Sequence, residues 1–184
     1  MDAFLISTGI VALAEIGDKT QLLALVLAAR YRKPVPIILG ILVATLLNHA
    51  VAGYVGAWFA NTIDEQWMRW ILGISFIAMA AWMLIPDKLD DADAKPARFG
   101  VFVTTLVAFF IVEIGDKTQV ATVFLAAKYA EVWAVVLGTT LGMMIANVPA
   151  VLLGEVAAKK LPMRLVHSVV AVVFLALGLV ILFS

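Results

Sequence analysis

The sequence predicts an all-α integral membrane protein with six transmembrane helices, arranged as two inverted three-helix repeats. Three observations support this fold class: the composition, the spacing of the apolar stretches, and a seven-residue segment that occurs twice. Hydrophobic residues make up 64% of the 184-residue chain and charged residues 14%, whereas soluble domains average about 45–50% apolar and about 25% charged residues. Little polar sequence is therefore left for a soluble domain.

Six apolar stretches are each long enough to cross a bilayer, which takes about 20 helical residues. They cover residues 3–29, 34–60, 67–85, 99–127, 132–158 and 163–183. Short polar segments separate them, and the longest of these is rich in acidic residues. We therefore expect residues 1–86 to form the first three-helix repeat, residues 87–98 an acidic cytoplasmic linker, and residues 99–184 the second three-helix repeat.

Basic residues predict the orientation in the membrane. The segments after the first, third and fifth stretches hold Arg30, Arg32, Lys33, Lys88, Lys95, Arg98, Lys159, Lys160 and Arg164. The opposite side holds only Arg69 and Lys128. Because cytoplasmic loops carry an excess of Lys and Arg, we expect the first group to be cytoplasmic. The protein would then be a multi-pass protein of the bacterial inner (plasma) membrane, with both termini on the periplasmic or extracellular side.

The repeated segment is Glu-Ile-Gly-Asp-Lys-Thr-Gln, at residues 15–21 and again at residues 113–119. Both copies lie within apolar stretches, and helical spacing would place the Glu and Asp of each copy on one face. Three spans per repeat turn the second copy upside down, and inverted repeats build transporters whose site lies near the bilayer midplane. We therefore expect four carboxylates to meet there: Glu15, Asp18, Glu113 and Asp116.

Carboxylates in a bilayer are costly, from about 2.5 kcal/mol upward for one charged group, so this cluster needs a cation, protons or both. Oxygen ligands suit Mg²⁺, Ca²⁺ or Mn²⁺ better than Zn²⁺ or Cu²⁺. Gly17 and Gly115 weaken the motif helices, so each helix is expected to unwind locally there. The auxiliary ligands that we expect are Thr20, Gln21, Asn48, Thr118, Gln119 and Asn147.

Lys19 and Lys117 are predicted counter-charges of the carboxylates. With both charged, the formal sum of the site is minus two, which one divalent ion or two protons would neutralise. They would either occupy the site when the ion leaves or only orient the acids. The alternative is a structural salt bridge between each Glu and the Lys four residues later.

The remaining polar features favour ordinary structural roles. His49 is interpreted as a hydrogen-bonded helix histidine rather than a proton relay, and His167 as structural. The acidic residues of the linker lack the pattern of a calcium loop. No nucleophile–histidine–acid set is present, so no enzyme is predicted, and no cofactor. Zero net charge without a basic tail argues against a nucleic-acid partner.

The doubled motif resembles the signature E-x-G-D-[KR]-[ST] of a family of Gdt-type cation/proton antiporters, and the resemblance covers nearly the whole chain. It implies that the four carboxylates are cation ligands and that Thr20 and Thr118 complete the motif. The family has manganese-exporting bacterial members and manganese/calcium transporters in eukaryotes. The resemblance alone, not the physics of the sequence, selects Mn²⁺ over Ca²⁺.

The expected function is export of Mn²⁺ from the cytoplasm in exchange for protons. Glu15 and Glu113 are the expected proton-exchanging pair, since burial in an apolar setting favours the neutral form of a carboxyl group. Two alternatives stay open: a Ca²⁺/H⁺ antiporter on the same scaffold, and an exporter of amino acids or other organic solutes. The expected partners are the cation, protons and the lipid bilayer. The oligomeric state is left open, with a homodimer as one option.

Overall fold

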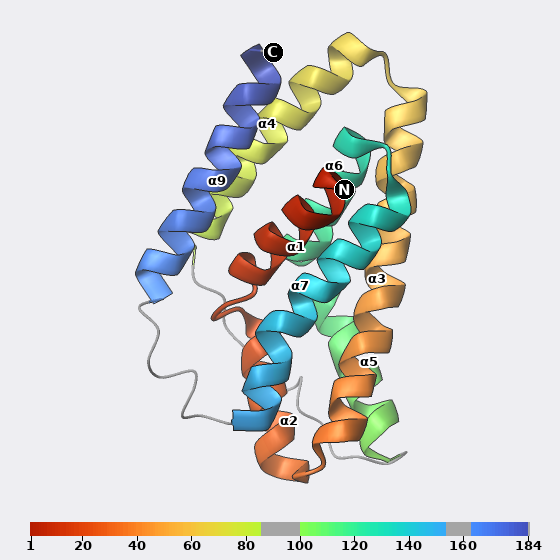
Figure 1. The fold of residues 1–184 in the computed structure, drawn as a ribbon, viewed down its shortest axis with the longest axis vertical. Coiled ribbons are helices and arrows are strands. Elements are labelled where there is room, and N and C mark those ends of the chain that lie inside the picture. Colours follow the sequence, from red (N-terminus) through yellow and green to blue (C-terminus); the bar gives the residue numbers. More distant parts are fainter. Residues whose placement is uncertain (86–99, 154–162, 184) are drawn as a thin grey trace.

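The computed structural model describes residues 1–85, 100–153 and 163–183, and within these ranges the regular elements are all helices (Figure 1). They are α1 (Asp2–Ala14), α2 (Lys19–Tyr31), α3 (Pro34–Thr62), α4 (Glu65–Met83), α5 (Val101–Glu113), α6 (Lys117–Tyr129), α7 (Val132–Leu153) and α9 (Met163–Phe183). The predicted all-helical class is confirmed for these ranges. The expected linker at residues 87–98 and the end of the fifth stretch lie outside the described residues.

The first and fourth apolar stretches each form two helices instead of one. The breaks fall at the repeated motif, between α1 and α2 and between α5 and α6. Gly17 has a φ of +82° and Gly115 a φ of +75°, values that glycine adopts without the steric cost of a side chain. The expected local unwinding at these two glycines is therefore present, and the continuous helix assumed for each motif is wrong.

Equivalent elements of the two halves run in opposite directions (Figure 1). Helices α1 and α2 descend in sequence from the upper end of the molecule to the lower end, whereas α5 and α6 ascend. Helix α3 ascends and α7 descends, and α4 descends while α9 ascends. In the vertical direction of this view, each helix of the second half thus runs opposite to its counterpart in the first half.

The main packing contacts join one half of the chain to the other. Helix α1 packs on α7, α5 packs on α3, and α4 packs on α9. A Cβ added to Gly40 would lie 2.9 Å from the carbonyl oxygen of Phe102, and one added to Gly138 would lie 2.5 Å from that of Phe4. Gly40 and Gly138 are ninety-eight residues apart in the sequence, and so are Phe4 and Phe102. Close backbone approach through small residues, common between membrane helices, therefore occurs at the same place in both halves.

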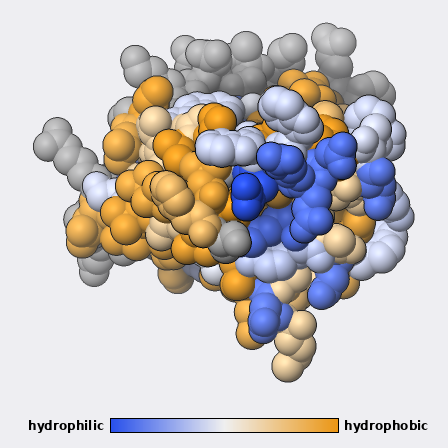
Figure 2. Space-filling view, turned by 90° about the horizontal axis from the view of Figure 1, so that it is seen from above, coloured by the Kyte–Doolittle hydropathy of each residue, from blue (hydrophilic) through white to orange (hydrophobic). Residues whose placement is uncertain are grey.

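Two helices, α3 and α7, are long and apolar enough to cross a membrane by length and composition, and α1, α5 and residues 167–183 are shorter apolar helices. Large hydrophobic side chains are exposed along them, including Trp58, Leu137 and Val172. Figure 2 views the end of the molecule at which α3 connects to α4. Hydrophilic residues gather on one part of this face, and hydrophobic residues cover much of the remainder.

Gly56 provides a test of the close packing between the halves. A Cβ at this position would clash with the backbone carbonyl oxygen of Val123 in α6. We expect Gly56→Ala to lower stability by about 1–3 kcal/mol, the usual cost of overpacking, as measured by thermal unfolding in detergent. Gly9→Ala is the matched control, because a Cβ there meets nothing within 4 Å and alanine favours the helix. Equal stability of the two variants would contradict the close contact between Gly56 and the backbone of Val123.

Candidate metal centre

The repeated motif builds the same turn twice. The N–H of Asp18 donates to the carbonyl oxygen of Glu15 at 3.1 Å, and the N–H of Gly17 donates to Gln21 Oε1 at 2.8 Å. In the second copy the corresponding bonds measure 3.1 Å and 2.7 Å. Asp18 and Asp116 are the N-cap residues of α2 and α6. An identical sequence therefore makes the same turn hydrogen bonds in each half, although α1 ends at Ala14 and α5 one position later in the repeat, at Glu113.

The two glutamines of the motif close these turns and reach the opposite half. The Gln21 side-chain amide donates to the carbonyl oxygen of Ala146 in α7 at 3.0 Å, and that of Gln119 donates to Asn48 Oδ1 in α3 at 3.3 Å. Both were predicted as auxiliary ligands. In the structure their Oε1 atoms accept hydrogen bonds from the backbone of the turn.

Three of the four predicted carboxylates come together. Glu15, Asp18 and Asp116 each offer an oxygen, and the three oxygens lie within 4.8 Å of one another. At most 3% of each residue is exposed. Ca²⁺–oxygen distances of about 2.3–2.6 Å place two ligands of one ion no more than about 5 Å apart. The spacing therefore suits a single hard divalent cation.

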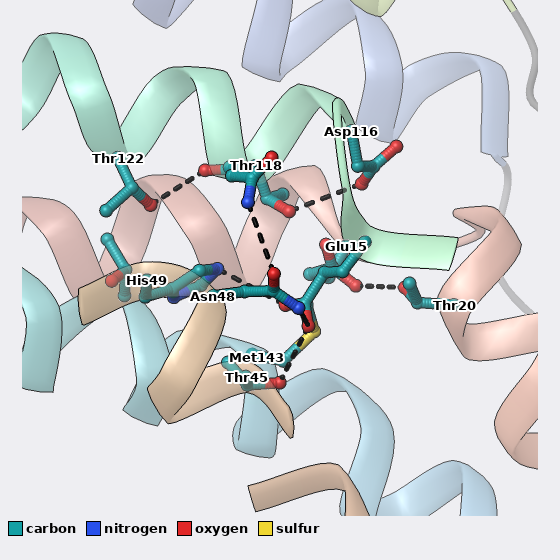
Figure 3. Close-up of polar contacts among 12 residues, drawn as sticks. Glu15, Thr20, Thr45, Asn48, His49, Asp116, Thr118, Thr122 and Met143 are labelled. Atoms are coloured by element: carbon teal, nitrogen blue, oxygen red, sulfur yellow. Dashed lines mark hydrogen bonds and ion pairs between the residues drawn. The ribbon is translucent and has the colours of Figure 1, made fainter. Parts of the chain in front are cut away.

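Further oxygens adjoin this group (Figure 3). Thr20 Oγ1 donates to Glu15 Oε2 and lies 3.5 Å from Asp18 Oδ2, while Thr118 Oγ1 lies 3.3 Å from Asp116 Oδ2. Asn147 Nδ2 lies 3.4 Å from Glu15 Oε2. Thr20, Thr118 and Asn147 therefore stand beside the carboxylates, where auxiliary ligands were expected.

Two buried acceptors near this group receive no hydrogen bond from the described residues: Glu15 Oε1 and Asn147 Oδ1. A buried polar atom without a partner costs about 1–3 kcal/mol, and more when it carries charge. A cation bound by the carboxylate group would give Glu15 Oε1 a partner.

Glu113 does not join the three-carboxylate group. Its Oε2 accepts from Asn48 Nδ2 at 3.2 Å and from Thr45 Oγ1 at 3.5 Å, and both donors belong to α3. His49 Nε2 lies 3.3 Å from Glu113 Oε1, within ion-pair distance but not aligned for a hydrogen bond. The prediction that His49 is hydrogen-bonded is therefore wrong, because neither ring nitrogen has a hydrogen-bond partner among the described residues.

Thr45 was not predicted as part of the site. It lies three residues before Asn48 and four before His49, so helical spacing places all three on one face of α3. A polar face within an otherwise apolar stretch was the signal that could have identified it.

The two motif lysines have different partners. Lys19 Nζ lies 3.1 Å from Asp116 Oδ1, so it contacts the other copy of the motif. Lys117 Nζ donates to the carbonyl oxygen of Ile85 at 2.7 Å. With Lys19 charged, three ionised carboxylates and one ammonium carry a formal charge of minus two, which one divalent cation neutralises.

An all-helical apolar chain with carboxylates buried at two helix breaks has the form of an ion transporter. The sequence matches the family described as "Divalent cation/proton antiporter GDT1" over residues 3–91 and 101–184. The chain belongs to this family of membrane transporters.

Curated relatives agree with this assignment. The chain is 52% identical to the "Putative manganese exporter" of Vibrio cholerae serotype O1, over 97% of this chain and 90% of the relative. It is 26% identical to "GDT1-like protein sll0615" of Synechocystis, over 95% and 93% of the two chains. It is 25% identical to "GDT1-like protein 5" of Arabidopsis thaliana, over 97% and 94%. No solved structure matches the chain.

The carboxylate group predicts stabilisation by divalent cations. Adding Mn²⁺ at about 100 times its dissociation constant should stabilise the purified protein by about 2.7 kcal/mol, seen as a higher unfolding temperature that a chelator reverses. Asp116→Asn should remove most of this response. Asp2→Asn, at an exposed position in the first turn of α1, should keep it. An unchanged response in Asp116→Asn would exclude Asp116 as a ligand.

Proposed function

We propose that this chain is a secondary transporter that exports Mn²⁺ from the cytoplasm in exchange for protons. The observation that carries the proposal is the buried group of Glu15, Asp18 and Asp116, whose oxygens lie within 4.8 Å of one another. Membership of the divalent cation/proton antiporter family supports the exchange. The 52% identity to a relative named as a manganese exporter supports the choice of ion.

The proposed architecture is six membrane spans in two inverted three-helix repeats, residues 1–86 and 99–184, joined by a cytoplasmic linker at residues 87–98. The opposite ascending and descending courses of equivalent helices (Figure 1) support it. The proposed orientation places both termini on the periplasmic side of the inner membrane and follows from the bias of basic residues alone. Helices α1 with α2, and α5 with α6, then each make one span broken at the motif.

In the proposed cycle, the carboxylates bind Mn²⁺ from the cytoplasm, the site opens to the outside, and protons displace the ion. A buried carboxyl group is less costly when it is neutral than when it is charged, so protonation of Glu15 releases the ion, and the neutral forms of Glu15 and Glu113 permit the return step. Asp18 and Asp116 complete the ligand set, and Thr20, Thr118 and Asn147 supply neutral oxygens beside it. Lys19 balances Asp116 when no ion is bound.

Hard oxygen ligands also suit Ca²⁺, so Ca²⁺ is the competing cation in the test below. An organic solute is less well supported, because Lys19 already pairs with Asp116 and Lys117 with a backbone carbonyl group.

Inverted membrane vesicles loaded with a pH-sensitive dye test the function. Adding Mn²⁺ should drive metal uptake with loss of lumenal protons. Glu15→Gln and Asp116→Asn should each reduce uptake by at least about tenfold, since even an outer partner of a metal ligand is typically worth 10–100-fold. Asp64→Asn, which changes an exposed acid, is the control.

Normal Mn²⁺ uptake by both site variants would show that the site is wrongly assigned. Uptake that Ca²⁺ supports and Mn²⁺ does not would identify the Ca²⁺/H⁺ alternative. Metal uptake without any change in pH would exclude proton exchange.

A further inference from the structure

The two glutamates of the repeated motif have identical sequence surroundings but different structural surroundings. Glu15 belongs to the three-carboxylate group, and Glu113 does not. Both are fully buried. Since the motif sequence is the same in both copies, the cause of the difference must lie in the helices that face them.

The helix that faces Glu113 provides three polar groups. Thr45, Asn48 and His49 of α3 approach the Glu113 carboxylate at 3.5, 3.2 and 3.3 Å respectively. The first two lie at Oε2 and the imidazole Nε2 lies at Oε1, so both oxygens of Glu113 face α3. Thr45 and His49 are fully buried, and Asn48 is 2% exposed.

The helix that faces Glu15 lacks two of these groups. At the ninety-eight-residue offset of the repeat, Asn147 of α7 corresponds to His49 and lies 3.4 Å from Glu15 Oε2. The residue that corresponds to Thr45 is Met143. The residue that corresponds to Asn48 is Ala146, whose backbone carbonyl oxygen accepts from Gln21 as Asn48 Oδ1 accepts from Gln119.

We propose that His49 is a positioning residue. It holds Glu113 apart from the ion site while the other three carboxylates bind the cation, a role that rests on the function proposed above. Glu113 joins the ligand set only in a different state of the transport cycle. Keeping Glu113 away from the other carboxylates limits the affinity for Mn²⁺, because four converging carboxylates bind a divalent ion more tightly than three and release it more slowly.

The proposal predicts the sign of an affinity change. His49→Val removes the imidazole group that lies at Glu113 Oε1. Released Glu113 should join the other carboxylates. The dissociation constant for Mn²⁺ should therefore fall about fivefold or more, the lower end of usual coupling between groups, while the maximal transport rate also falls. A residue that only supports the fold would weaken binding instead.

Binding of Mn²⁺ is measured on the purified chain in lipid nanodiscs, with electron paramagnetic resonance detecting the free Mn²⁺. Transport is measured on the same chain in liposomes. His49→Val is compared with the wild type, with Glu113→Gln and with the double variant. In the Glu113→Gln background, His49→Val should leave the dissociation constant unchanged. His49→Gln keeps a side-chain donor and should restore the wild-type affinity. His167→Val, at the other histidine, in α9, is the matched control.

Thr45→Val removes the hydroxyl donor at Glu113 Oε2 with little change of shape, so it should also tighten Mn²⁺ binding. This variant tests the proposal if His49→Val does not fold. Unchanged or weaker Mn²⁺ binding in these variants, or tightening that persists without Glu113, overturns the role of His49 and leaves the proposed function intact. A wild-type protein that binds neither Mn²⁺ nor Ca²⁺ would overturn both proposals.

Discussion

The cost of burying negative charge governs this structure. Three carboxylates lie together with almost no exposed surface, and moving an ion out of water costs several kcal/mol even after the protein relaxes. One lysine, two threonines and an asparagine offset part of that cost. The remaining formal charge matches a divalent cation. On the proposed function, a site that is costly without its ion has a built-in tendency to bind one.

The broken helices are the means by which the chain meets this constraint. A continuous helix would bond its own backbone groups and direct the Glu and Asp of a motif only sideways. The turn at Gly17 and at Gly115 instead ends one helix at the glutamate and starts the next at the aspartate. Because the N-terminus of a helix carries partial positive charge, each aspartate lies at a helix end that favours an anion. The motif is thus a turn and a ligand pair in one segment.

The sequence predicts the helix breaks of the fold but not every contact of the candidate site. Glycine between two acids within an apolar stretch indicates a break, because both the glycine and the acids are unfavourable in a helix in lipid. The separation of Glu113 from the other acids could not be predicted from the motif, which is identical in both copies. It depends on Thr45 and His49, which lie more than sixty residues earlier in the chain. The packing of α1 on α7 could not be predicted from the sequence either, because a helix that is apolar all round shows no preferred face.

The crossed packing of the two halves limits how the protein can move. Helix α1 is held on α7, and α5 on α3, through backbone contacts so close that a methyl group would not fit at Gly138 or Gly40. Pulling the N-terminal half away from the C-terminal half would open both contacts at once. Helices α4 and α9 pack chiefly on each other, again one from each half. On the proposed transport function, any body that moves as a unit therefore combines helices of both halves, with α4 and α9 paired beside the other described helices.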